Sequence, residues 1–139
     1  MSRTLLAALT ATTLLAGTAV HSHDNAMAEK FAAHRLAYFG KGDAAALLAQ
    51  YAEDATVILP TGVLHGRDQI KGMIDAIIGE FAQPGVKFTL IGQAAEGEVA
   101  TFTWSAETAV NIYDLGAETY VLKDGLITYQ TFAAKVAAR

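Results

Sequence analysis

Residues 51–81 read YAEDATVILPTGVLHGRDQIKGMIDAIIGEF, and this stretch decides the fold. Residues 55–59 are mainly apolar and β-branched and stop at Pro60-Thr61-Gly62, so we predict a short strand followed by a turn. The second half predicts a helix over residues 70–81 with one buried face. Its apolar residues recur at the spacing i, i+3, i+4, i+7, i+8 and i+11, namely Ile70, Met73, Ile74, Ile77, Ile78 and Phe81.

Two further helices are expected on the N-terminal side of this stretch. Residues 26–39 carry apolar side chains at helical spacing, and Gly40 follows as a stop. Asp43 occupies the N-cap position of the next apolar stripe, which predicts a helix over residues 44–51 that ends at Tyr51.

The hydrophobic period changes to two on the C-terminal side, from residue 86 onward. Helices first and a series of antiparallel strands afterwards predict an α+β fold, with the helices packed on one face of the sheet. The four strands are predicted at residues 86–91, 98–109, 117–122 and 126–136. Turn residues separate them, namely Glu96-Gly97, Asn111 with Asp114 and Gly116, and Lys123-Asp124-Gly125.

Composition narrows the class of protein further. The 139 residues are 53% hydrophobic and contain no linker or repeat, so we expect one domain over residues 26–136. The net charge of −4, without a run of Lys or Arg, argues against a nucleic-acid partner. The absence of cysteine excludes disulfides, thiolate zinc sites and a cysteine nucleophile.

The N-terminus has the pattern of an export signal. Arg3 precedes a mostly apolar segment over residues 5–16, and Gly17-Thr18-Ala19 offers the small residues that a signal peptidase recognises. We therefore predict a signal peptide over residues 1–19, with cleavage after residue 28 as the alternative. The mature protein is expected in the periplasm or outside the cell, without membrane attachment after cleavage.

Several short sequence words carry a family resemblance. They are Gly42-Asp43, YAEDATV at residues 51–57, PTG at 60–62, HGRDQI at 65–70 and KDGLI at 123–127. Together they resemble the SnoaL-like branch of the nuclear transport factor 2-like superfamily, which includes ketosteroid isomerases, polyketide cyclases and scytalone dehydratase. The resemblance implies a conical fold, in which a curved, mostly antiparallel sheet wraps a pocket that the N-terminal helices close. It also implies a homodimer formed through the convex face of the sheet.

Ketosteroid isomerase gives this resemblance a testable template. That enzyme uses an Asp base together with a Tyr and a protonated Asp that donate hydrogen bonds to the substrate oxygen. The base position, just before Pro60, is Leu59 here, and leucine accepts no proton. The Tyr position corresponds to Arg35, with His34 beside it, and the acid position falls on or next to Glu118. Isomerisation by the ketosteroid mechanism is therefore not expected.

Strand alternation selects the side chains that face the pocket. Glu118 and Tyr120 share one face of their strand, and Gln130 and Phe132 share one face of the next. The template's register turns both pairs inward, where an apolar setting would suit Glu118 to donate a proton. The alternative is that Glu118 faces solvent. Trp104 is expected either to line the pocket or to fill the core.

Three hypotheses about function remain open at this point. The first is an exported binder of a small apolar molecule. The second is a cofactor-independent isomerase, cyclase, dehydratase or epoxide hydrolase that uses Glu118 with His34 or Arg35. The third is a dimerisation module whose cavity is filled by its own side chains. No metal or cofactor is expected, since no phosphate loop or spaced ligand cluster is present. The predicted ligand contacts are Tyr38, Tyr51, Leu59, Trp104, Tyr120, Gln130 and Phe132.

Overall fold

The computed structural model describes residues 21–139, with side chains from residue 30 onward. The predicted signal peptide, residues 1–19, lies outside the described residues. The described part begins with helix α1 (His21–Lys41) and helix α2 (Ala44–Leu48), followed by strands β1 (Tyr51–Leu59) and β2 (Gly62–His65) and helix α3 (Gly66–Phe81). Four longer strands complete it, namely β3 (Lys87–Glu96), β4 (Val99–Glu107), β5 (Asn111–Lys123) and β6 (Leu126–Ala138).

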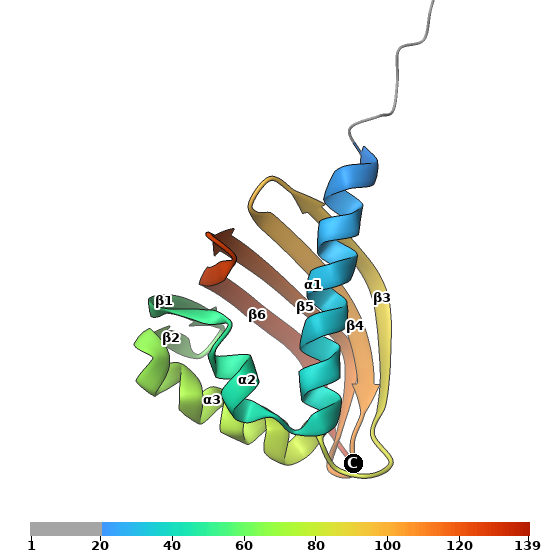
Figure 1. The fold of residues 1–139 in the computed structure, drawn as a ribbon. Coiled ribbons are helices and arrows are strands. Elements are labelled where there is room, and N and C mark those ends of the chain that lie inside the picture. The colour runs from blue at the N-terminus through green and yellow to red at the C-terminus, as the bar shows by residue number, and fades with distance from the viewer. Residues whose placement is uncertain (1–20) are drawn as a thin grey trace, which may run out of the picture.

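All six strands form one curved sheet in the order β2-β1-β6-β5-β4-β3. Every neighbouring pair is antiparallel except β1 and β6, which run parallel. Register shifts interrupt the ladders, for example between Leu90 and Gly92 and between Trp104 and Ala106. Such bulges bend a sheet. Figure 1 shows α1 crossing one face of the sheet, with α2 and α3 on the same side near β1. The predicted α+β fold with a mostly antiparallel sheet is confirmed.

The helix signals in the sequence act as expected. Asp43 caps α2, and its carboxylate accepts a hydrogen bond from the backbone N–H of Ala46 at 2.9 Å. Such a cap contributes roughly 1 kcal/mol. Helix α3 buries Ile70 and Ile74 completely or nearly so, and each buried isoleucine contributes roughly 1.5–3 kcal/mol. Among residues 21–139, no helix combines the length and the apolar character that crossing a membrane requires.

The hairpin between β5 and β6 follows directly from its turn residues. Asp124 and Gly125 both have positive φ, at 52° and 79°. Two successive positive φ values are the geometry of the tight turn that matches the twist of the flanking strands. A register shift between Val121 and Leu122 follows this turn, and the two together place Tyr120 opposite Gln130 and Glu118 opposite Phe132.

Several predicted boundaries are wrong, and one strand was missed. Strand β3, predicted to end at residue 91, continues to Glu96. Helix α2 ends at Leu48, and Tyr51 begins β1, because pairing with Ile127 of β6 prevails over the helical spacing. Residues 111–116, predicted as a turn, belong to β5, where a bulge after Tyr113 absorbs the irregular sequence. The four-residue strand β2 was not predicted, because its residues read as the continuation of a turn.

Candidate functional site

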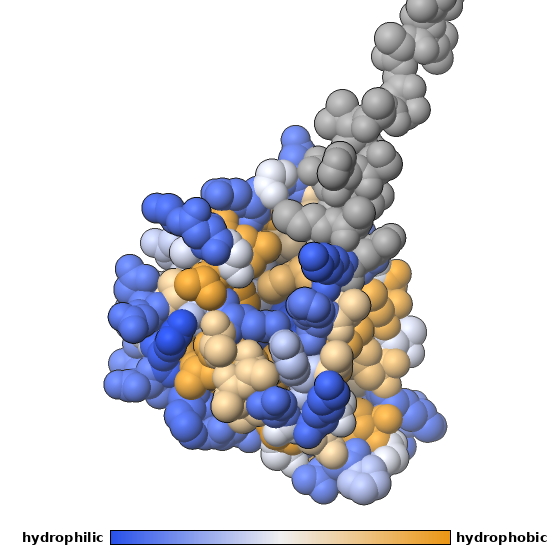
Figure 2. All heavy atoms as spheres, in the orientation of Figure 1, coloured by the Kyte–Doolittle hydropathy of each residue, from blue (hydrophilic) through white to orange (hydrophobic). Residues whose placement is uncertain are grey.

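A large cavity lies between α1, α3 and the concave face of the sheet. Its volume is about 910 Å³. Figure 2 shows the face that α1 crosses, where apolar residues lie in patches among hydrophilic ones. The cavity wall is mainly apolar, and its polar side chains come from α1, α3, β5, β6 and the turns after β1 and α3. Apolar lining residues include Leu36, Phe39, Leu59, Met73, Ile77, Phe81, Leu90, Phe102 and Phe132.

Alternation along the strands brings the predicted inward residues to the cavity. Glu118, Tyr120, Gln130, Phe132 and Trp104 all line it. Tyr120 is 1% exposed and Gln130 is 3% exposed, so both belong to the core as well as to the cavity wall. On β4, the buried residues alternate with more exposed ones, as the period-two pattern predicts. The alternative that Glu118 faces solvent is therefore wrong.

Glu118 is the centre of a hydrogen-bond network in the cavity wall. The Trp104 indole N–H donates to Glu118 Oε1 at 3.0 Å. The Tyr120 hydroxyl donates to Oε2, and the amide nitrogen of Gln130 lies 3.5 Å from the same oxygen. Burial raises the pKa of Tyr120 well above its ordinary value, so its phenol remains a neutral donor. Both oxygens of Glu118 thus accept hydrogen bonds from the protein.

Arg35 lies at the inner end of the same network. Its guanidinium donates to Gln50 Oε1 at 2.8 Å and to the Tyr51 hydroxyl at 3.2 Å. The Tyr51 hydroxyl in turn donates to Gln130 Oε1. Burial raises the pKa of Tyr51 while Arg35 opposes that rise. A chain of hydrogen bonds therefore links Arg35 of α1, Tyr51 of β1 and Glu118 of β5 through Gln130.

Not all of the predicted site residues reach the cavity. His34 is exposed and does not line it, whereas its neighbour Arg35 is 6% exposed and does. Tyr38 also lies outside the lining, half-buried beside His34. Tyr51 is completely buried behind the wall, where it supports Arg35 and Gln130 and does not face a ligand. Leu59 lines the cavity and presents no proton acceptor there.

Comparison with known proteins identifies the family of this fold and cavity. Residues 18–130 match the SnoaL-like domain family. The chain belongs to this family. No match to this SnoaL-like domain was found among curated protein sequences.

Solved structures with the same fold are distant in sequence. A SnoaL-like protein of unknown function from Burkholderia thailandensis is 17% identical, with a TM-score of 0.65 over 79% of this chain and 96% of that one. A nuclear transport factor 2-like protein of unknown function from Burkholderia xenovorans is 14% identical, with a TM-score of 0.65 over 82% and 87%. SalBIII, an epoxide hydrolase/cyclase-like enzyme in pyran ring formation in the polyether salinomycin, is 13% identical, with a TM-score of 0.65 over 84% and 98%. These likenesses show the fold of this SnoaL-like domain.

A second carboxylate of the SnoaL-like domain lines the cavity and was not predicted. Glu80 is near the C-terminal end of α3 and accepts three hydrogen bonds: from the Thr108 hydroxyl at 2.7 Å, the Asn111 amide at 2.9 Å and the Tyr113 hydroxyl at 2.9 Å. Burial opposes the charged form, but these three donors lower the pKa of Glu80 below its ordinary value. Burial, together with the contact to Glu80, raises the pKa of Tyr113 to about 12. The sequence contained a clue to this position: Glu80 follows Ile77 by three residues, so both side chains lie on the same face of the helix.

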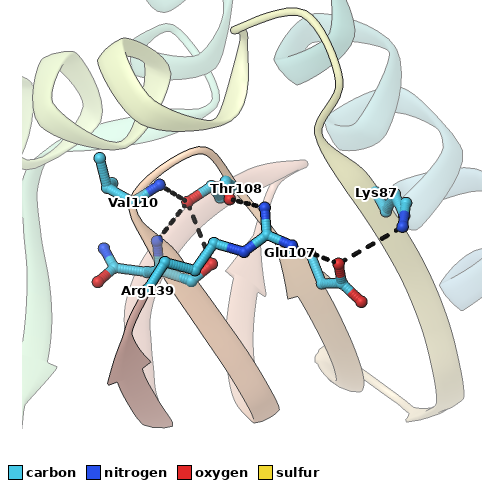
Figure 3. Close-up of polar contacts among 6 residues, drawn as sticks. Lys87, Glu107, Thr108, Val110 and Arg139 are labelled. Atoms are coloured by element: carbon cyan, nitrogen blue, oxygen red, sulfur yellow. Dashed lines mark hydrogen bonds and ion pairs between the residues drawn. The ribbon is translucent and has the colours of Figure 1, made fainter.

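The turn between β4 and β5 is fixed to Glu80 through Thr108. The Thr108 hydroxyl accepts from the backbone N–H of Asn111 at 2.9 Å, and the Thr108 carbonyl accepts from Arg139 at 3.1 Å. Figure 3 shows Arg139 reaching across the turn to Glu107, which Lys87 also approaches. The strand ends next to α3 are thus tied together, and they position Glu80 and Tyr113 at the cavity.

Metal ligation finds no support in the described part of the SnoaL-like domain. Among the residues whose side chains the structure describes, no three His, Asp or Glu side chains lie close enough together to hold an ion. The polar groups that do converge are Glu118, Arg35 and Gln130, with Trp104 and Tyr120 as donors. This arrangement can donate hydrogen bonds to a bound molecule and accept them from it.

Proposed function

We propose that this SnoaL-like domain binds one small, mainly apolar molecule in the cavity beneath α1. The cavity itself carries the proposal. Its volume of about 910 Å³ is close to the upper end of the roughly 300–1,000 Å³ typical of small-molecule sites. A domain with only a structural role gains nothing from such a space, because empty volume lowers stability. The volume therefore favours a binding role over the dimerisation module with a filled cavity.

The chemistry of the wall supports an apolar ligand. Leu36, Met73, Ile77 and Phe81 line the side formed by the helices, and aromatic side chains line much of the sheet. Apolar surface removed from water contributes roughly 25 cal/mol per Å². The polar groups form two clusters, one around Glu118 and Arg35 and one around Glu80, so they can orient the ligand without contributing most of its affinity.

Catalysis by Glu118 is the second candidate. The observation that favours it is the position of Glu118 and Arg35, which both line the cavity and belong to one hydrogen-bond network. A carboxylate beside a bound molecule can exchange a proton with it, as isomerases, cyclases, dehydratases and epoxide hydrolases require. The network also has a purely structural use, because it satisfies buried polar groups. Binding is therefore the function that the cavity supports best.

A fluorescence titration tests the binding proposal. Trp104 is the only tryptophan and lines the cavity, so energy transfer to a bound probe reports occupancy. N-phenyl-1-naphthylamine, a neutral apolar fluorophore, is expected to bind and to quench Trp104 emission. Ala134→Phe fills the cavity from β6 and is expected to weaken binding at least about tenfold, a loss of about 1.4 kcal/mol. Ala137→Phe, at an exposed position of the same strand outside the lining, is the matched control.

Equal binding by the parent, Ala134→Phe and Ala137→Phe would place the probe elsewhere and would overturn the proposal. Circular dichroism of each variant accompanies the titration, because an overpacked core can lose its ordered structure. A folded Ala134→Phe variant that has lost the probe while Ala137→Phe retains it is the expected outcome.

We also propose export and dimerisation as the setting of this function. The signal-like segment at residues 1–19 supports export to the periplasm, and N-terminal sequencing of protein from its own host tests it. A start at Met1 in the cytoplasm would overturn export.

The outer face of the sheet carries small side chains such as Ala117, Thr119 and Ala133, which suit close packing against a second copy. Light scattering at micromolar concentration is expected to give twice the monomer mass, and a monomer mass would overturn dimerisation.

A further inference from the structure

Arg35 has an unusual setting for a charged side chain. It is 6% exposed, and its guanidinium carbon lies 4.7 Å from the centroid of the Tyr120 ring. Three more aromatic rings surround it at 5.5–5.9 Å, namely those of Tyr51, Phe39 and Phe31. An arginine side chain remains charged at every physiological pH. The fold thus keeps a permanent positive charge in an aromatic enclosure at the cavity wall.

The protein satisfies only part of this guanidinium. Of its five N–H groups, one on Nη1 donates to Gln50 and one on Nη2 donates to Tyr51. Nε is buried and has no acceptor among the described residues. The second N–H groups of Nη1 and Nη2 likewise meet no protein acceptor in the described part of the chain. Both acceptors are neutral oxygens, so the charge itself is not compensated by them.

Glu118 does not contact Arg35, although its negative charge is among the causes that raise the pKa of Arg35 against the effect of burial. No carboxylate oxygen among the described residues lies within 4.0 Å of Arg35. The two oxygens of Glu118 instead accept from Trp104, Tyr120 and Gln130. A buried charge without a close partner is costly. The cavity therefore contains a guanidinium with unused donors that an anionic group of a ligand would complete.

We propose that the molecule bound in the cavity is an apolar carboxylic acid, whose carboxylate accepts hydrogen bonds from Arg35 while its apolar body lies against α1, α3 and the sheet. This inference rests on the proposed binding function and adds the class of ligand. A carboxylate matches the planar fork of a guanidinium. Gln50 and Tyr51 already fix the plane of that fork, so little further ordering is needed on binding.

The test compares an acid with its uncharged ester. cis-Parinaric acid and its methyl ester share one fluorescent polyene chain and absorb where Trp104 emits, so energy transfer reports both. In the parent protein the acid is expected to bind at least about tenfold more tightly than the ester. The ratio of the two dissociation constants isolates the head group, because the apolar body is the same.

Two arginine variants assign that ratio to Arg35. Arg35→Lys keeps the charge but loses the fork, and it is expected to lower the acid-to-ester preference severalfold. Arg67→Lys is the matched control, since Arg67 donates to the Tyr51 carbonyl at 2.8 Å and 2.6 Å but does not line the cavity. It is expected to lose stability while the parent preference remains unchanged.

The outcomes separate this inference from the function on which it rests. Equal affinity for acid and ester in the parent, or a preference for the ester, overturns the assignment of a carboxylate and leaves apolar binding intact. Binding of neither probe overturns both. If Arg35→Lys does not fold, the preference measured in the parent still decides. An unchanged preference in a folded Arg35→Lys variant assigns the head group to another residue and overturns the role of Arg35.

Discussion

Trp104 packs so closely on Gly116 that adding one methyl group there, by Gly116→Ala, is expected to destabilise the fold. A Cβ atom added at Gly116 would lie 2.3 Å from Cε2, 2.4 Å from Cζ2 and 2.6 Å from Cδ2 of the Trp104 ring. Ordinary contact begins near 3.4 Å, so the ring must move by about 1 Å. Four aromatic side chains restrict that movement, with centroids 5.4–6.2 Å from the Trp104 ring, namely Phe81, Phe88, Tyr113 and Phe132.

Gly116→Ala is therefore expected to lower the free energy of unfolding by roughly 2–4 kcal/mol. Overpacking a core costs about 1–3 kcal/mol, and displacing the indole weakens its hydrogen bond to the Glu118 carboxylate, which is worth about 1.5–3 kcal/mol. Backbone strain adds nothing, because the φ of Gly116 is not positive. Urea unfolding followed by Trp104 fluorescence and by circular dichroism measures the loss, and the emission maximum of the folded variant reports the displaced ring.

Gly72→Ala is the matched control for this substitution. Gly72 lies on α3, and an added Cβ there meets no atom within 4 Å. Alanine in place of an exposed helical glycine is expected to stabilise by roughly 0.4–1 kcal/mol. If Gly116→Ala changed the unfolding free energy by no more than the control and left the Trp104 emission unchanged, the packing of Trp104 on Gly116 would be refuted.

Three further predictions concern the carboxylates and the base position. Because the pKa of Glu80 is lowered in the folded state, its contribution to stability is complete above its ordinary pKa of 4.5 and is lost as the pH falls through the folded-state pKa. The urea midpoint of the parent should therefore fall in acid, and Glu80→Gln should show a smaller fall over the same pH range. The parent should not isomerise a Δ5-3-ketosteroid, whereas Leu59→Asp should give a trace; robust turnover by the parent in an absorbance assay would contradict the assignment of the base position. Glu118→Gln should lower stability by about 1–3 kcal/mol in urea unfolding, because an amide cannot accept at both positions where Glu118 does. If Glu118→Gln matched the parent in stability and in probe affinity from pH 5 to 8, Glu118 would have no role in the site.

The sequence predicted most of the wall formed by the sheet, because strand alternation is a local rule. Glu118 and Tyr120 lie where the period of two places them, whereas Gln130 faces the cavity only because of the register shift between Val121 and Leu122, which the sequence did not predict. The choice between His34 and Arg35 needed the structure. Both lie on one helix turn, and only the packing of α1 against the sheet decides which one is buried.

Glu80 and Tyr51 show where sequence reasoning failed for physical reasons. A glutamate at the edge of an apolar helix stripe normally faces water, and here three donors from the distant β4 and β5 region hold it at the cavity. Helical spacing assigned Tyr51 to α2, but parallel pairing with β6 makes it a buried strand residue. Both errors arise from contacts between segments far apart in the chain, which local patterns do not contain.

Mass spectrometry of the native protein tests the central claim of this account, that the cavity holds a small molecule. The measurement uses protein purified from its own host under native conditions without added ligand, and the same chain carrying Ala134→Phe or Ala137→Phe. The account predicts one small organic molecule bound to the parent and to Ala137→Phe, released on denaturation, and absent from Ala134→Phe. A parent protein whose native mass equals that of its polypeptide alone, with nothing recovered in an organic extract, would contradict it.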